Sequence, residues 1–164
     1  MPKVTTDIAA LILRLAAGAI FIPHGWPKIM GEGGARVFAA DMASTYNVPT
    51  FLGYLAAYSE VIGATLLIAG LFTRLDALLL AGTMFVAAFI VLLPDALYEV
   101  PPDAIKAFVV LKGIELPLAL LAICLALLLS GPGRASLDHL LRIEERFRAF
   151  LPKKKAAAEA AAHV

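Results

Sequence analysis

The sequence has few of the residues from which redox and metal sites are usually built. It contains one cysteine, Cys124, and three histidines in 164 residues. A single cysteine excludes an intrachain disulfide, a CxxC pair and a cysteine-based zinc site. His24 is the only histidine within an apolar segment, so two histidines of one chain cannot ligate a haem inside a membrane. We expect no intrinsic metal or cofactor, and any redox chemistry requires a bound molecule or a partner subunit.

Charged residues are scarce as well. They make up 16% of the chain and hydrophobic residues 61%, whereas soluble domains are about 25% charged and about 45–50% apolar. The sequence has no phosphate-binding loop and no GxGxxG motif that opens a helix after a strand. Membrane topology explains the positive charges, so no nucleic-acid partner is expected. The composition indicates a polytopic membrane protein whose main partner is the lipid bilayer.

Four apolar runs have close to the ~20 residues that cross a bilayer. They predict spans at about 8–29, 49–70, 75–93 and 108–129. The expected fold is all-α, with a four-helix transmembrane bundle over residues 1–134. A cleaved signal peptide is the alternative for the first run. We favour a span because Arg14 interrupts the apolar core and no clear A-x-A cleavage site follows.

Lysine and arginine are distributed unevenly between the two sides of the predicted bundle. Three lie on one side: Lys28, Arg36 and Lys106. Nine lie on the other: Lys3, Arg74, Arg134, Arg142, Arg146, Arg148, Lys153, Lys154 and Lys155. Because cytoplasmic flanks carry the excess of positive charge, both termini are expected in the cytoplasm, with the segments 31–48 and 94–107 outside.

The C-terminal portion divides into two parts. Residues 135–151 have apolar positions near helical spacing, with Ser136 as the expected cap and Asp138 in the first turn. This pattern predicts an amphipathic helix on the cytoplasmic membrane surface, and a helix that docks a partner protein is the alternative. Residues 152–164 are basic and alanine-rich, and we expect a mobile tail there.

Glu60 lies at the middle of the second span, where a carboxylate costs about 2.5–3.5 kcal/mol even on insertion scales. At 100° per residue it shares a face with small residues, which mark helix–helix contact in membranes. These are Gly53, Ala56, Ala57, Gly63 and Ala64. Glu60 is therefore expected to point into the bundle and to meet a basic side chain.

The other spans have comparable faces. The first carries Arg14, Gly18, Phe21, Gly25 and Lys28; the third carries Ala77, Ala81, Met84 and Ala88. The fourth carries Lys112, Glu115, Ala119, Ala122 and Ala126. All three faces are predicted to look inward.

Depth along the spans predicts which ionisable groups meet. Arg14 is the expected partner of Glu60. Four other groups lie at comparable levels nearer the outer face: His24, Lys28, Lys112 and Glu115. Of these, Lys112 and Glu115 are close enough to pair on one helix. We predict a pocket between the first, second and fourth spans. In it His24, Glu60 and Glu115 would act catalytically, and Arg14, Lys28 and Lys112 would bind substrate. The alternative is that these charges only fix helix packing.

Three fragments resemble the DoxX family. Arg14 with Gly18, His24-Gly25 and Lys28 resembles its opening helix. The family's second helix and turn are similar to Glu60-x-x-Gly63 with Leu67-Ile68-Ala69-Gly70-Leu71-Phe72-Thr73-Arg74. Its closing segment is similar to Gly131-Pro132-Gly133-Arg134-x-Ser136-Leu137-Asp138. The resemblance implies a four-helix protein of a bacterial or archaeal inner membrane. Some relatives are subunits of thiosulfate:quinone oxidoreductases, and others are linked to oxidative stress or quinone detoxification.

The resulting hypothesis is a membrane component of a quinone-linked redox system that binds a quinone and works with a soluble or membrane redox partner. The alternatives are a carrier or channel for a small solute, and a scaffold that docks a soluble enzyme. The sequence leaves open whether the chain acts as a homo-oligomer.

Overall fold

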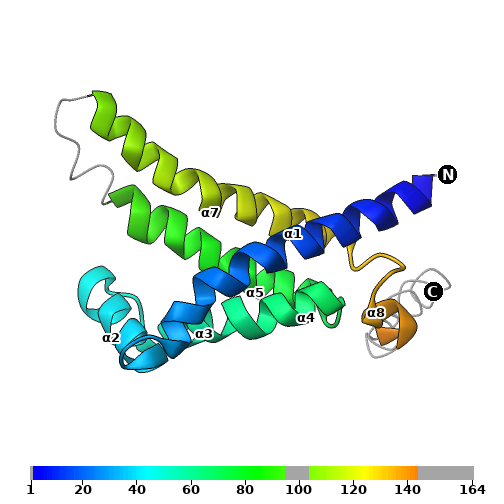
Figure 1. The fold of residues 1–164 in the computed structure, drawn as a ribbon, viewed down its shortest axis with the longest axis horizontal. Helices are drawn as coiled ribbons and strands as arrows, with labels where there is room; N and C mark the ends of the chain where they lie inside the picture. Colours follow the sequence, from blue (N-terminus) through cyan, green and yellow to red (C-terminus); the bar gives the residue numbers. More distant parts are fainter. Residues whose placement is uncertain (1, 95–103, 144–164) are drawn as a thin grey trace, which may run out of the picture.

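The computed structural model describes residues 2–94 and 104–143. Within these ranges the chain is helical and contains no strand, which confirms the all-α prediction (Figure 1). The elements are α1 (Pro2–Met30), α2 (Gly34–Tyr46), α3 (Thr50–Tyr58), η1 (Ser59–Gly63), α4 (Ala64–Ala69), α5 (Thr73–Val86), η2 (Ala87–Leu92), α7 (Ala104–Ser130) and α8 (Leu137–Leu140). The segments η1 and η2 are π-helical turns that continue the helices before them.

Four helices in the described part of the chain are long and apolar enough to cross a membrane. They are Val4–Met30, Thr50–Ala69, Thr73–Leu92 and Lys112–Ser130. The second is built from α3, η1 and α4, and the third from α5 and η2. Each coincides with a predicted span, although the first begins at Val4 and runs through Pro23 and Pro27 to Met30. The chain is a membrane protein.

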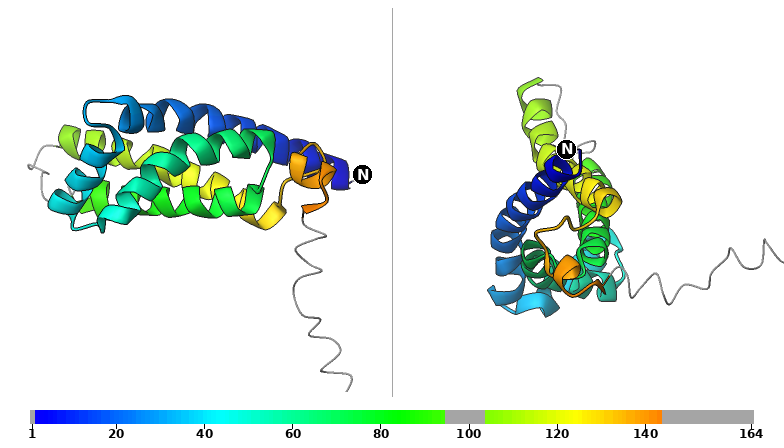
Figure 2. Two further views of the ribbon diagram at one scale, coloured as in Figure 1. Left: turned by 90° about the horizontal axis from the view of Figure 1, so that it is seen from below. Right: turned by 90° about the vertical axis from the view of Figure 1, so that its right-hand side faces the viewer.

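The bundle has two distinct ends. Figure 2 shows the N-terminus, the turn between α4 and α5, and α8 together at one end, and α2 at the other. We call these the α8 end and the α2 end. Hydrogen bonds tie the α8 end together. Among them, Asp138 N–H donates to the carbonyl of Gly70, and Arg134 N–H to the carboxylate of Asp7. Segments far apart in sequence therefore close this end of the bundle.

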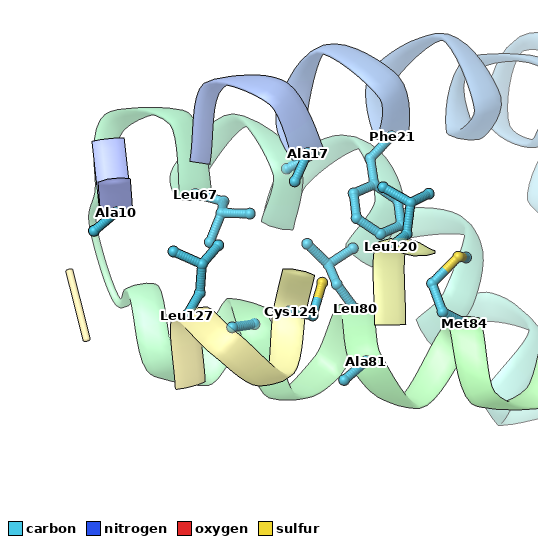
Figure 3. Close-up of a cluster of buried hydrophobic side chains, with 12 residues drawn as sticks. Ala10, Ala17, Phe21, Leu67, Leu80, Ala81, Met84, Leu120, Cys124 and Leu127 are labelled. Carbon is cyan, nitrogen blue, oxygen red and sulfur yellow. The ribbon is translucent and has the colours of Figure 1, made fainter. Parts of the chain in front are cut away.

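The apolar core lies between the helices and extends toward the α8 end (Figure 3). Phe21 from α1, Leu67 from α4, Leu80 from α5 and Leu127 from α7 are buried in it. The helices pack mainly as α1 on η1 and α4, and as α5 on α7. The predicted inward faces of the first three spans are correct, since Gly18, Phe21, Ala57, Gly63, Ala77 and Ala88 are buried.

The predicted inward face of the fourth span is wrong. Lys112, Glu115, Ala119, Ala122 and Ala126 are exposed, and the buried residues of α7 are Ile114, Leu120, Cys124 and Leu127. The physical reason lies on the third span, where Ala77 and Ala81 of α5 and Ala88 of η2 already form a groove of small side chains. Larger residues of α7 fill that groove, so a second small-residue face is not needed at this contact.

The connection between the first two spans contains a helix that the sequence analysis missed. α2 covers much of the segment 31–48, which was expected only as an extramembrane connection. Ala39 of α2 is fully buried, and its Cα lies 2.7 Å from the position that a Cβ on Gly53 would take. α2 is thus packed closely on α3 and ends at Asn47, which has a left-handed conformation.

The C-terminal segment also differs from the prediction. Ser136 caps α8 as expected, because its hydroxyl accepts from His139 N–H at 3.1 Å. However, α8 ends at Leu140, and Arg142 has a positive φ of 52°, so the predicted continuous helix is interrupted. Ser136 and Asp138 are buried against the bundle instead of lying on its surface. The remainder of that helix and the expected tail, 144–164, lie outside the described residues.

Gly25 gives a test of how closely α1 and η1 approach. A Cβ at this position would lie 2.7 Å from the Cβ of Glu60 and 3.1 Å from its carbonyl carbon. We expect Gly25→Ala to lower the free energy of unfolding in detergent by about 1–3 kcal/mol, the usual range for overpacking. Gly113→Ala is the matched control, because a Cβ there meets no atom within 4 Å and alanine favours a helix. Equal effects of the two substitutions would contradict the packing.

Candidate functional site

Glu60 forms an ion pair with Lys28 inside the bundle. The Nζ atom of Lys28 lies 2.6 Å from both carboxylate oxygens of Glu60. The Glu60 side chain is only 2% exposed and that of Lys28 is 27% exposed. The prediction that Glu60 points inward and meets a basic residue of another helix is therefore correct, although the partner differs from the one expected.

Local structure explains why these two groups meet. Glu60 lies in the π-helical turn η1, and such turns occur frequently at functional sites because the wider turn redirects the side chains around it. Gly25 lies against the backbone of Glu60 and lets α1 come close. Lys28 follows one turn later on the same face of α1, and its flexible stem then reaches the carboxylate.

Arg14 does not pair with Glu60. It is fully buried nearer the α8 end, where a guanidinium N–H donates to the carbonyl oxygen of Ala135. At 1.5 Å per residue, Arg14 and Lys28 are separated by about 21 Å along α1. The lysine lies level with Glu60, so the arginine has no role in this pair.

A cavity of about 340 Å³ lies beside the ion pair. Its walls come from α2, α3, α5 and η2, and include Phe38, Met42, Leu52, Ala56, Gly82, Thr83, Ala87 and Val91. The pocket was predicted between the first, second and fourth spans. Among the residues whose side chains the structure describes, the third span lines this cavity and the fourth does not, so that prediction is wrong about the fourth. Two of its lining residues, Leu55 of α3 and Leu78 of α5, are exposed at the bundle surface.

The cavity is apolar except at one end. Its charged lining residues are Lys28 and Glu60, and the hydroxyl of Thr83 donates to the carbonyl of Leu80 on its own helix. The ring of Phe38 lies with its centroid 5.0 Å from Nζ of Lys28, within the range of a cation–π contact. A molecule in this cavity would meet one ammonium and one carboxylate at its polar end and hydrocarbon elsewhere.

The remaining predicted site residues lie outside the cavity. His24 is exposed, and its Nδ1 is 2.8 Å from the carbonyl oxygen of Ile20 one turn earlier. Lys112 and Glu115 are exposed on α7. The expected internal network of these groups with Lys28 is therefore wrong. Among the described residues, no group of three or more His, Cys, Asp or Glu side chains could hold a metal ion.

A second buried polar cluster, at the α8 end, was missed by the sequence analysis. The Asp138 carboxylate accepts the N–H groups of Phe72 at 2.7 Å and Thr73 at 2.8 Å, and so caps α5. Asp76, one turn into α5, is 3% exposed. The position of Asp76 in the predicted third span was a usable signal, because an acid inside a span is rare. The role of Asp138 was not visible in the sequence. Its partners Phe72 and Thr73 lie 66 and 65 positions earlier in the chain, and no local pattern reveals so distant a contact.

Comparison with known families agrees with this arrangement. The DoxX family profile matches residues 9–93, just over half of the chain. The chain belongs to the DoxX family. The residues that line the cavity, from Lys28 to Val91, all fall within the matched region. The part of this DoxX protein that forms the cavity is thus the part that carries the family pattern.

Three relatives extend the comparison. The inner membrane protein YqjF of Escherichia coli is 27% identical over 85% of this chain and 96% of its own length. The inner membrane protein YphA of the same organism is 28% identical over 80% of this chain and 89% of its own. CatD of Bacillus subtilis, whose name gives it provisionally as an oxidoreductase, is 36% identical over 48% of this chain and 55% of its own. No solved structure gives a significant match.

The strength of the ion pair can be measured with a double-mutant cycle on Lys28→Met and Glu60→Gln. Removing one partner leaves the other buried and uncompensated, so we expect a coupling free energy of about 1–3 kcal/mol for unfolding in detergent. The same two changes at Lys112 and Glu115 form the matched control, since these residues are exposed and three apart on one helix. Their coupling should stay below about 0.5 kcal/mol. Similar values from the two cycles would refute the buried pair.

Proposed function

We propose that this DoxX protein is a membrane component of a quinone-linked redox system and binds the quinone in the cavity beside Lys28 and Glu60. The observation that carries the proposal is a buried ion pair at the polar end of an apolar cavity of about 340 Å³. Ligand sites typically span about 300–1,000 Å³, with apolar walls and a few polar groups that fix orientation. A quinone has the matching chemistry, because polar carbonyl oxygens are joined to an apolar ring and tail.

The exposed lining residues of α3 and α5 support a ligand that arrives from lipid. Leu55 and Leu78 line the cavity and are about half exposed on the outer surface of the bundle, which faces hydrocarbon in a membrane. A membrane quinone dissolved in the bilayer could enter sideways and place its head group at Lys28. A water-soluble substrate would need an aqueous route to the same place.

Lys28 and Glu60 would have complementary roles in this site. The ammonium of Lys28 donates a hydrogen bond to a quinone oxygen and stabilises the negative charge that develops there on reduction. Reduction to the quinol takes up two electrons and two protons. Lys28 passes one proton to each quinone oxygen in turn and is reprotonated through Glu60 after each transfer, and the two electrons come from a partner subunit that holds a redox centre.

We further place the protein in the inner membrane with the α8 end in the cytoplasm. Lys3, Arg74, Arg134 and Arg142 belong to this end, and the names of YqjF and YphA support the inner membrane. The provisional name of CatD supports redox chemistry. The carrier or channel alternative is less favoured, because the lining of the cavity extends from Glu60 toward the α2 end and the α8 segment closes the opposite end.

Quinone binding tests the proposal directly. Purified protein in detergent or nanodiscs is titrated with a short-tail ubiquinone or menaquinone analogue, and Kd is measured for the wild type and for Lys28→Met, Glu60→Gln and Gly82→Phe. We expect each substitution to weaken binding by about tenfold or more. Gly82→Phe should act by filling the cavity. Gly82 lines the cavity, and a Cβ added to it would have no atom within 4 Å, so a larger side chain has room to enter.

Gly113→Phe is the control for Gly82→Phe. Gly113 has the same free space around a new Cβ but lies exposed on α7, away from the cavity, so its Kd should match the wild type. Absence of saturable quinone binding by the wild type would contradict the proposal. So would binding that the three cavity substitutions leave unchanged.

A further inference from the structure

Asp76 is a buried carboxyl group that the proposed quinone site does not use. Its side chain is 3% exposed, and its Oδ2 atom has no hydrogen-bond partner among the described residues. The other two buried carboxylates of this part of the chain are satisfied: Glu60 by Lys28, and Asp138 by two N–H groups of α5. An unsatisfied acid within a membrane span is expensive and commonly marks a proton or ion pathway.

Three more buried polar atoms at this end lack a partner among the described residues. They are Nε and Nη1 of Arg14 and the hydroxyl of Thr73, and both residues are fully buried. Thr73 precedes Asp76 by one turn of α5, and Arg14 lies against Gly70 beside the α8 segment. Groups of this kind normally bond to internal water, which can both donate and accept. The α8 end therefore has the polar lining of a hydrated interior site.

The charges of this cluster favour a proton on Asp76. Among the described residues, the buried titratable groups on the surrounding elements are Arg14 on α1, Glu60 on η1, Asp138 in α8 and Cys124 on α7. Lys28 neutralises Glu60, which leaves one guanidinium facing two carboxyl groups. Asp138 accepts two N–H groups at the N-terminus of α5, where the helix dipole favours a negative charge. Asp76 has no comparable donors and is the group that holds the proton.

A small gap connects Asp76 to the helix turn of Glu60. The position that a Cβ on Gly63 would take is 3.8 Å from Oδ1 of Asp76, 3.8 Å from the Cβ of Ser59 and 3.9 Å from Leu80. Gly63 and Ser59 both belong to η1, which also carries Glu60. The absent side chain of Gly63 thus leaves space between the acid on α5 and the π-helical turn at the polar end of the cavity.

We propose that Asp76 is a proton-relay residue that passes protons, through internal water, from the α8 end to Glu60. The inference rests on the proposed quinone function, since the quinone is what consumes the proton at Glu60. Asp76 gives up a proton to water in the gap at Gly63 and is reprotonated from the α8 end past Thr73 and Asp138. No electron moves in this step, and one proton enters for each proton delivered.

Infrared spectroscopy of the protein in lipid tests the relay. We expect the wild type to show the C=O stretch of a neutral carboxyl group at neutral pH, shifting on transfer to D2O, and Asp76→Asn to lack it. Thr73→Val should keep the band but slow its shift in D2O by about tenfold, because it removes the buried hydroxyl on the route by which Asp76 is reprotonated from the α8 end. Thr65→Val, the same change at an exposed threonine of α4, is the control and should exchange at the wild-type rate.

The outcomes separate this inference from the quinone proposal. A purely structural Asp76, ionised at the start of α5, would give no neutral band, and that result overturns the relay. An unchanged band in Asp76→Asn, or wild-type exchange in Thr73→Val, overturns it as well. Asp76 does not line the cavity, so Asp76→Asn should bind the quinone analogue with an unchanged Kd. Failure of the wild type to bind quinone would reject the proposed function while the infrared result still decided whether Asp76 carries an exchangeable proton.

Discussion

The organisation of this bundle depends on one carboxylate, that of Glu60, which is held away from water in a chain that crosses a membrane. Lys28 compensates its charge, and the surrounding structure serves that contact. The π-helical turn positions the acid, Gly25 allows α1 to approach it, and Phe38 of α2 covers the ammonium. Replacing such a pair with apolar residues would often stabilise a protein. Its presence beside a cavity is therefore better explained by binding than by packing alone.

The buried polar groups of the described residues form two centres along the bundle. The apolar core lies between these centres and continues toward the α8 end. One is the Lys28–Glu60 pair beside the cavity, and the other is the cluster of Arg14, Asp76 and Asp138. The match to the DoxX family covers Arg14, Lys28, Glu60 and Asp76 but ends before α7 and Asp138. The first three spans thus carry the Lys28–Glu60 pair together with Arg14 and Asp76, whereas α8 adds Asp138 and closes one end. The contacts of α7 with α5 are mainly apolar.

Much of the fold could be predicted from the sequence. The length of each apolar run locates the membrane spans, and helical periodicity identifies the small residues that face a neighbouring helix. The same rule failed for Lys112 and Glu115, since one small-residue groove on the third span satisfies the contact and α7 fills it with larger side chains. The partner of Glu60 was predicted wrongly because helix register and tilt, which set depth, come from tertiary packing. The capping of α5 by Asp138 joins distant segments and has no local signature.

The central claim is that Glu60 and Lys28 are paired within the membrane, and solid-state NMR in lipid bilayers tests it most directly. With lysine labelled at 15Nζ and glutamate at 13Cδ, the account predicts a strong dipolar coupling that disappears in Lys28→Arg, which carries no 15Nζ label. The exposed residues Lys112 and Glu115 provide an internal comparison, and Glu115→Gln should leave the coupling intact. A glutamate signal with no coupling to a lysine, or one that survives in Lys28→Arg, would contradict the account.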